Sequence, residues 1–286
     1  MVRYTLLAMF AIRPWPKPSK EESQHNNIAL VKDFFVFTLF LFVMFYASST
    51  IDVNIAYDFP SSQVSGSLFT ACIMIAVMFV WVFEMPIPTK SDSKWDAIGA
   101  IGHASFYSLQ ALFLQTAYTL CKAYAMLTGN TKLLAATYRC ALWTTVNGTG
   151  LTVLFFGLMW FQKKWQKEIG RPMEKTHPGA SNVMFFVHLL PLFVAFFDII
   201  FLCDTTFIIA HGAQWNTVVQ MGFMYAAVYL CWCKFLQYKF NCFIYPFIRD
   251  ITNFWKLFAC VVIMGILTAL NSYVLNYIMM MTIITV

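Results

Sequence analysis

The sequence predicts an all-α protein, a polytopic bundle of about seven transmembrane helices. Composition is the first reason: 60% of the 286 residues are hydrophobic and only 11% are charged, whereas soluble domains are about 45–50% apolar and about 25% charged. The second reason is that apolar stretches of roughly 20 residues, enough to cross a bilayer, recur along the chain. The net charge of +6 predicts no nucleic-acid partner, because basic residues gather in the loops of membrane proteins for topological reasons.

Seven stretches are predicted to span the membrane: residues 28–48, 66–86, 97–120, 135–161, 180–203, 215–238 and 255–281. They divide the chain into an N-terminal tail, residues 1–27, and a single bundle, residues 28–286. With alternate loops on opposite sides, three of the 19 Lys and Arg residues (Lys122, Lys132 and Arg139) fall on one side and sixteen on the other. The positive-inside rule then predicts a cytosolic N-terminus and a lumenal or extracellular C-terminus, in the endoplasmic reticulum or the plasma membrane.

The first four spans differ in their sequence features. The first is expected to be a plain apolar anchor, and the second ends at Pro86 and Pro88, which stop a helix. In the third, Ser108, Gln115 and Tyr118 are separated by seven and three residues and therefore share one helical face. Such a polar face is expected to point into the bundle rather than at lipid. The fourth contains Asn147-Gly148-Thr149, whose small residues are expected to allow close packing of helices.

The fifth span contains His188 and Asp198, while the sixth and seventh qualify by length and apolar composition. A charge at mid-bilayer costs about 2.5–3.5 kcal/mol on insertion scales, so ionisable residues there indicate a functional site or a buried hydrogen-bonded pair. Asp198 lies ten residues beyond His188, about 15 Å along the helix, and cannot orient its imidazole. We expect Asp198 to pair with a base or a hydroxyl elsewhere in the bundle.

A hydroxyl in the third span and an imidazole in the fifth permit nucleophilic catalysis. An imidazole can take the proton of a serine hydroxyl, which then attacks an acyl group. From spacing alone, the alternative that these polar residues only pack the bundle stays open. The histidines and cysteines lack the spacing of zinc ligands, so the sequence predicts no metal and no cofactor.

Three short motifs, in the same order and with similar spacing, resemble those of a known family. They are Phe106-Tyr107-Ser108-Leu109 with Gln115, His188 with an acidic residue ten positions later, and Tyr229 and Trp232 followed by Ile244-Tyr245-Pro246-Phe247. The family is that of the androgen-induced and androgen-dependent multi-pass membrane hydrolases. The resemblance covers about residues 95–280.

The resemblance implies an intramembrane hydrolase that cleaves fatty acid esters of hydroxy fatty acids with a Thr nucleophile and a His base. These two positions fall on Ser108 and His188, so the chain has Ser where the family has Thr. Phe243 stands where the family has a Trp. The expected partners are membrane lipids and a fatty acyl ester substrate. The hydrolysis would need a donor to the oxyanion, and the candidates are Gln110, Gln115, Arg139 and Tyr229.

Two other classes of function remain open. A non-catalytic structural or regulatory membrane protein of the same fold would explain the replacement of Thr by Ser. A seven-span receptor or transporter for a lipidic ligand is the other class. However, the predicted cytosolic N-terminus is opposite to that of G-protein-coupled receptors, and no transporter-like repeat is visible. The sequence does not predict the oligomeric state.

Overall fold

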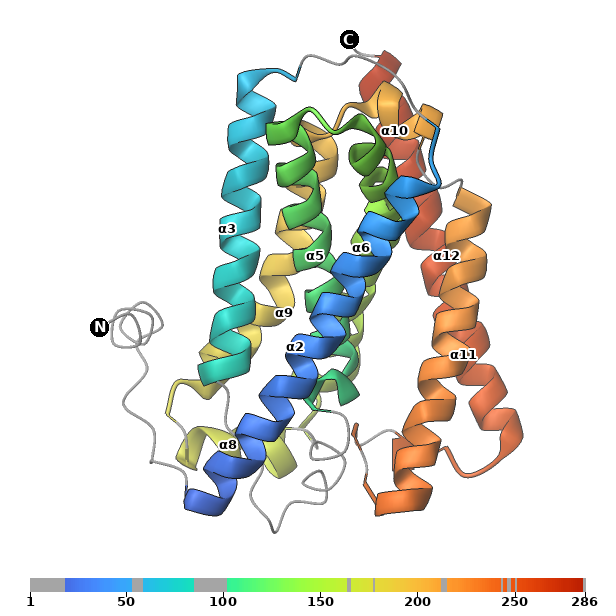
Figure 1. Cartoon of the computed structure of the whole chain (residues 1–286). Helices are drawn as coiled ribbons and strands as arrows, with labels where there is room; N and C mark the ends of the chain where they lie inside the picture. Colours follow the sequence, from blue (N-terminus) through green and yellow to red (C-terminus); the bar gives the residue numbers. More distant parts are fainter. Residues whose placement is uncertain are drawn as a thin grey trace.

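In the computed structural model the chain is a bundle of long helices (Figure 1). The structure describes residues 19–52, 59–84, 102–163, 166–176, 178–211, 215–242, 244–245, 248–249 and 251–284. Within these ranges every regular element is a helix or a helical turn. Five of the helices are long and apolar enough to cross a membrane. The predicted all-α membrane class is confirmed to that extent.

The long helices of the described chain follow the predicted spans in order. They are α2 (Lys20–Ser49), α3 (Ser61–Glu84), α5 (Tyr107–Thr128), α6 (Thr131–Phe155), α9 (Ala180–Phe197), α11 (Trp215–Phe240) and α12 (Phe254–Ile284). Between them lie the 3₁₀ turn η1 (His103–Ser105), the short helices α8 (Arg171–Thr176) and α10 (Thr205–His211), and the π-helical segments η2 (Phe156–Trp160), η3 (Gln166–Gly170) and η4 (Asp198–Leu202).

Helix ends differ from the prediction where local contacts decide them. α2 begins at Lys20, inside the predicted tail, because Ser19 and Glu22 form a capping box. α5 begins ten residues later than the predicted third span and ends at Gly129, whose positive φ of 66° suits a helix C-terminus. Residues 97–101, the prolines predicted to end the second span, and the tail up to residue 18 lie outside the described residues.

The α5–α6 hairpin forms the centre of the bundle (Figure 1). α2, α3 and α9 pack against α5, while α2, α9, α10 and α12 pack against α6, and α11 packs mainly on α12. α5 and α6 are not among the five helices apolar enough to span by composition. They tolerate polar residues because neighbouring helices, rather than lipid, surround them.

Successive long helices run in opposite directions, so α2, α5, α9 and α12 are parallel to one another (Figure 1). α2 begins at the end of the bundle where α8 lies, and α12 ends at the other, beside α10.

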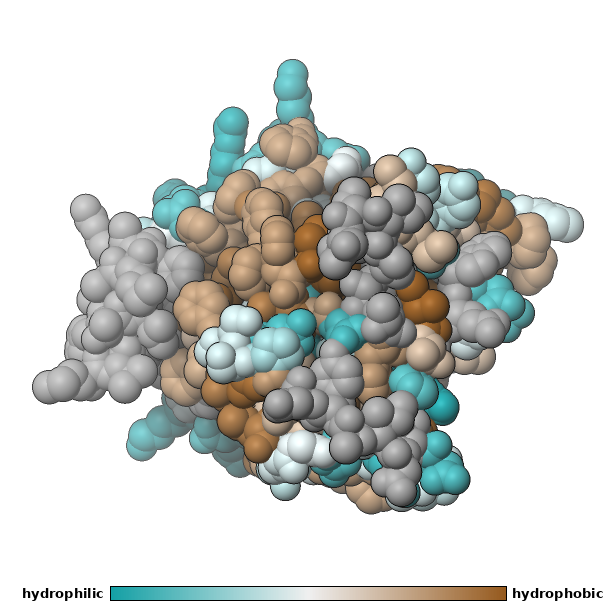
Figure 2. Space-filling model, turned by 90° about the horizontal axis from the view of Figure 1, so that it is seen from above, coloured by the Kyte–Doolittle hydropathy of each residue, from teal (hydrophilic) through white to brown (hydrophobic). Residues whose placement is uncertain are grey.

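Hydrophobic side chains cover much of the described surface seen from above, with hydrophilic ones between them and at the rim (Figure 2). Large aromatic side chains are exposed on the flanks, among them Phe34 (71% exposed) and Trp255 (74%). The exposed apolar side chains of the flanks suit contact with lipid.

The side chain of Glu174 in α8 caps the N-terminus of α9. Its carboxylate accepts hydrogen bonds from the N–H groups of Gly179 (2.7 Å) and Ser181 (3.0 Å), where α9 has no side-chain cap of its own. Burial on its own would raise the pKa of Glu174, but these backbone bonds outweigh it and lower the pKa below its ordinary value. Glu174 therefore favours the folded state when it is ionised.

Glu174 is expected to make the stability of the bundle sensitive to acid. Because its pKa is lower in the folded than in the unfolded chain, its contribution is present above about pH 4.3 and is lost as the pH falls through the folded-state pKa. Glu174→Gln should lower the free energy of unfolding at pH 7 by about 0.5–1 kcal/mol and weaken the pH dependence below pH 5. Thermal unfolding in detergent from pH 3 to pH 7 measures both, with exposed Asp52→Asn as control. A pH dependence identical to that of the unmodified protein would contradict this role.

Candidate functional site

The predicted site residues meet where α5 and α9 pack side by side, a line of contact that we name the α5–α9 seam. Two hydrogen bonds show how these parallel helices are aligned along their length. Gln115 Nε2 donates to the Pro191 carbonyl oxygen (2.8 Å), 76 residues further along the chain. Tyr118 OH donates to Asp198 Oδ2 (2.8 Å), 80 residues further along. Residues of α5 therefore lie level with the turn of α9, or with the start of η4, that is 76–80 residues further along the chain.

Ser108 and His188 have a separation at the upper end of this range. His188 follows Ser108 by 80 residues, the same separation that joins Tyr118 to Asp198. Ser108 also lies two turns from Gln115 on the same face of α5, the face that meets α9. Both side chains are buried, with 7% of Ser108 and 4% of His188 exposed. The range of 76–80 residues places Ser108 level with the turn of α9 from residue 184 to residue 188, and no hydrogen bond joins Ser108 to His188 in the described part of the chain.

The His188 ring is held in one tautomer. Its Nδ1 lies 2.7 Å from the carbonyl oxygen of Met184, and since a carbonyl only accepts, Nδ1 carries the hydrogen. Nε2 is then the nitrogen with the lone pair. The Phe155 ring stacks on the imidazole at 3.6 Å between centroids and 11° between planes. A backbone carbonyl thereby does the orienting that a carboxylate does in a Ser-His-Asp triad.

Ser108 lies in the first turn of α5, which tyrosine hydroxyls cap. The residue before the helix, Phe106, is extended and provides no side-chain cap. Instead, the Tyr107 N–H donates to the hydroxyl oxygens of Tyr229 (2.8 Å) and Tyr245 (3.1 Å). A phenol from the loop between α11 and α12 therefore lies beside the predicted nucleophile.

The predicted oxyanion donors occupy different places. Gln115 is engaged by Pro191, and Gln110 Nε2 donates to the Ala104 carbonyl (2.6 Å) while its Oε1 accepts from Tyr225. Tyr229 lies at the first turn of α5 and donates to the Ser105 carbonyl (3.1 Å).

Arg139 is distant from this level. It is exposed on α6, eight residues, or about 12 Å along the helix, from Asn147, whose Oδ1 accepts from Tyr107 OH (2.8 Å). Sequence reasoning gave Tyr245 no role, although it belongs to the third motif that resembles the hydrolase family. Phe243, Pro246 and Phe247 of that region lie outside the described residues.

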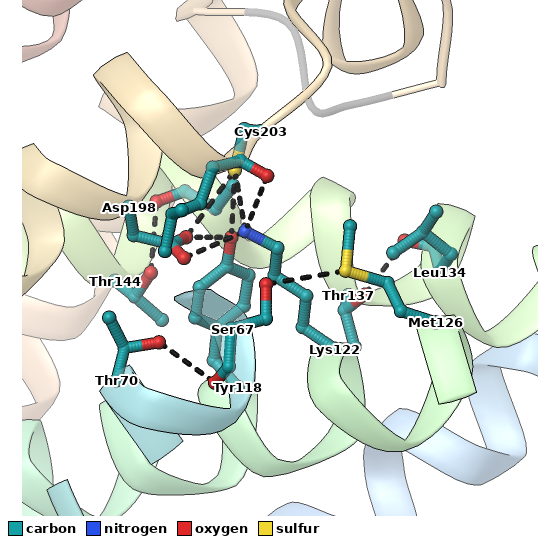
Figure 3. Close-up of polar contacts among 12 residues, drawn as sticks. Ser67, Thr70, Tyr118, Lys122, Met126, Leu134, Thr137, Thr144, Asp198 and Cys203 are labelled. Carbon is teal, nitrogen blue, oxygen red and sulfur yellow. Dashed lines mark hydrogen bonds and ion pairs between the residues drawn. The ribbon is translucent and has the colours of Figure 1, made fainter. Parts of the chain in front are cut away.

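A second polar cluster lies at the other end of the seam (Figure 3). Lys122 (0% exposed) and Asp198 (1%) form an ion pair with 2.7 Å between Nζ and Oδ1. Nζ also lies 3.2 Å from the Leu202 carbonyl oxygen and 3.2 Å from Cys203 Sγ. The Asp198 carboxylate accepts in addition from Tyr118 OH and Cys203 Sγ (3.3 Å). We name this set the Lys122 cluster.

The Lys122 cluster confirms one expectation and corrects another. Asp198 was expected to pair with a base or a hydroxyl elsewhere in the bundle, and it pairs with both. The prediction that Lys122 lies in a loop on the outer side was wrong, because it lies within α5. The charge count treated every lysine as a loop residue, whereas a carboxylate partner allows this one to stay inside the bundle.

The first helix is not a plain anchor. Asp33 of α2 is buried (2% exposed), with Oδ2 2.7 Å from His103 Nδ1 and Oδ1 accepting from the Ala104 N–H (3.0 Å). Gly102, at φ 77°, allows the chain to pass close to this carboxylate. The expectation of an anchor without polar contacts was therefore wrong. Asp33 ties α2 to the turn that precedes α5.

A small cavity with a mainly apolar lining lies between α5, α6, α11 and α12. It has a volume of about 30 Å³ and is lined in part by Tyr107, Asn147, Tyr225 and Thr268. It has room for one or two water molecules but not for an acyl chain. In the described part of the chain, no group of three or more His, Cys, Asp or Glu residues is arranged to hold a metal ion.

Comparisons with protein-family models, with curated proteins and with solved structures returned no match for this chain. An inference about its function therefore depends on its own residues and their geometry.

Proposed function

We propose that the protein is an intramembrane lipid esterase that uses Ser108 as the nucleophile and His188 as the general base. The observation that carries the proposal is the register of the α5–α9 seam, in which His188 follows Ser108 by the separation that joins Tyr118 to Asp198. The tautomer of His188 adds support, because its Nδ1 is engaged by Met184 and Nε2 holds the lone pair that a base needs.

In the proposed reaction, Ser108 Oγ attacks the ester carbonyl while His188 Nε2 accepts its proton. The proton then passes to the leaving alkoxide, which departs as an alcohol and leaves an acyl group on Ser108. A water molecule, deprotonated by the same imidazole, releases the fatty acid and restores the serine. The oxyanion needs a nearby donor, and the Tyr245 hydroxyl is a candidate because its oxygen accepts from the N–H of Tyr107, the residue before Ser108 (3.1 Å).

The surroundings favour an apolar substrate. Buried aliphatic and aromatic side chains, including Leu109, Phe113, Val183 and Val187, pack beside the level of Ser108 and His188. Fatty acid esters of hydroxy fatty acids, the substrates implied by the resemblance to the membrane hydrolases, are of this kind. Such lipids would reach the site from the bilayer.

We also propose seven spans with the N-terminus in the cytosol, in the endoplasmic reticulum or the plasma membrane. α5 and α6, which lack the apolar composition of the other five, would span because those helices enclose them. With Lys122 inside the bundle, the bases on the α10 side fall from three to two, Lys132 and Arg139. The charge asymmetry that supports this orientation becomes stronger.

A non-catalytic regulatory protein of the same fold is the second candidate. The contacts of His188 favour it, because the ring is held by Met184 and Phe155 and no hydrogen bond among the described residues joins it to Ser108. A receptor or transporter for a lipidic ligand is supported by the ionisable pairs inside the bundle, Lys122–Asp198 and Asp33–His103.

Labelling with a fluorophosphonate probe, which modifies activated serines, tests the proposal. We expect the purified protein to be labelled in detergent, with the adduct mapped to Ser108 by mass spectrometry. Ser108→Ala should abolish labelling, and Ser108→Thr, which restores the residue of the resembling family, should retain it. Ser272→Ala is the matched control, since Ser272 is a buried serine bonded only within α12. Undiminished labelling of Ser108→Ala would exclude this nucleophile.

A further inference from the structure

Both charged groups of the Lys122 cluster, the ammonium of Lys122 and the carboxylate of Asp198, have hydrogen-bond partners within the protein. The three hydrogens of Nζ have three acceptors: Asp198 Oδ1, the Leu202 carbonyl and Cys203 Sγ. The second carboxylate oxygen of Asp198 accepts from Tyr118. The π-helical segment η4, which begins at Asp198, brings the Leu202 carbonyl to Lys122. A closed network of this kind leaves no vacant position for a ligand.

Apolar contacts such as those along the seam are non-directional and constrain the register less sharply than polar pairs do. A movement of α5 along α9 by one turn, about 5.4 Å, would keep aliphatic side chains such as Leu112, Val187 and Val194 in an apolar cluster but would break the bond from Gln115 to the Pro191 carbonyl. The same shift would separate Lys122 from Asp198 and leave a cation and an anion unpaired among apolar groups. Buried polar groups that tolerate only one alignment specify the register of helices in coiled coils.

We propose that the Lys122–Asp198 pair fixes the register of α5 on α9 and thereby positions Ser108 opposite His188. Lys122 lies 14 residues from Ser108, about 21 Å along the helix, so the pair does not touch the reacting atoms. Both residues are positioning residues. The part concerning register stands by itself, and the part concerning Ser108 and His188 rests on the proposed esterase.

Four variants separate register from stability: Lys122→Met, Asp198→Leu, the apolar double variant, and the exchanged pair Lys122→Asp with Asp198→Lys. Each single variant leaves one buried charge unpaired and should unfold at a lower temperature in detergent. The double variant should recover most of that loss, because apolar side chains of similar volume replace a buried ion pair well. Thr119→Val is the matched control, since Thr119 is a buried polar residue of α5 bonded only to its own helix.

Hydrolysis of a long-chain p-nitrophenyl ester gives the catalytic readout. The apolar double variant should lose at least tenfold in kcat with KM within about twofold of the unmodified protein, although it is folded. The exchanged pair should regain part of kcat. A purely structural role for the pair predicts that kcat follows the melting temperature, so a stable double variant with unchanged kcat would overturn the positioning role.

A distance measurement tests the register without any activity. Spin labels are placed on α5 and α9 at the lipid-exposed positions Tyr124→Cys and Phe193→Cys, in a background in which the exposed or half-buried cysteines are alanine: Cys72, Cys140, Cys231 and Cys260. We expect one narrow distance distribution in this background. It should broaden, or shift by about one helical turn, in the apolar double variant. An unchanged distribution refutes the register, whereas a shift together with no esterase activity in any form refutes only the esterase.

Discussion

Replacing His188 by alanine is expected to slow hydrolysis of a long-chain ester by about 10²–10⁴-fold while the protein stays folded. Without Nε2 as the acceptor, the Ser108 proton must pass to water, which is a far weaker base. Acylation and deacylation should slow together, since one imidazole serves both steps. Fluorophosphonate labelling should slow as well, because the probe reports the activated hydroxyl.

The size of this effect depends on how His188 is held. Its Nδ1 bond to Met184 and its stacking on Phe155 fix the ring, so His188→Gln should be nearly as inactive as His188→Ala. His211→Ala is the control: this histidine lies in α10, also against an aromatic ring, that of Phe207. Steady-state rates and melting temperatures of the three variants form the measurement. A His188→Ala protein that keeps its rate would remove the imidazole from the mechanism.

Much of the fold could be predicted because apolar length is a local property. Each predicted span has a long helix at its place, and helices such as α11 and α12 begin within one residue of the prediction. The start of α5 could not be predicted, because it is capped by the hydroxyls of Tyr229 and Tyr245, which are 122 and 138 residues away from Tyr107. Hydropathy contains no information about such distant partners.

The candidate site, too, could be predicted from the sequence only in part. The shared face of Ser108, Gln115 and Tyr118 follows from helical periodicity, and this is the face that bonds to α9. The orientation of His188 depends on a carbonyl that every sequence supplies, so no residue type could reveal it. Lys122 was misplaced because counting charges in loops assumes that spans contain none.

Asp33→Ala is expected to lower the free energy of unfolding by about 3 kcal/mol, the scale for breaking a buried polar pair. Asp33 joins His103 and the Ala104 N–H to α2, and the Ala104 carbonyl accepts from Gln110 in α5. Removing the carboxylate leaves these groups without their partner just before the turn that contains Ser108. Esterase activity should therefore fall together with stability.

The sign of this effect separates two views of the first helix. If α2 were only an apolar anchor, alanine would be harmless or favourable, because Asp33→Ala removes a charge from a membrane helix. If Asp33 ties α2 to the turn before α5, the melting temperature in detergent should drop by about 5–10 °C. The melting temperature should drop less for Asp33→Asn, which keeps an oxygen for the Ala104 N–H. It should be unchanged for Asp52→Ala, since Asp52 is exposed. An Asp33→Ala protein as stable as the unmodified chain would show that α2 is only an anchor, because removing a carboxylate that ties α2 to the turn should lower the free energy of unfolding.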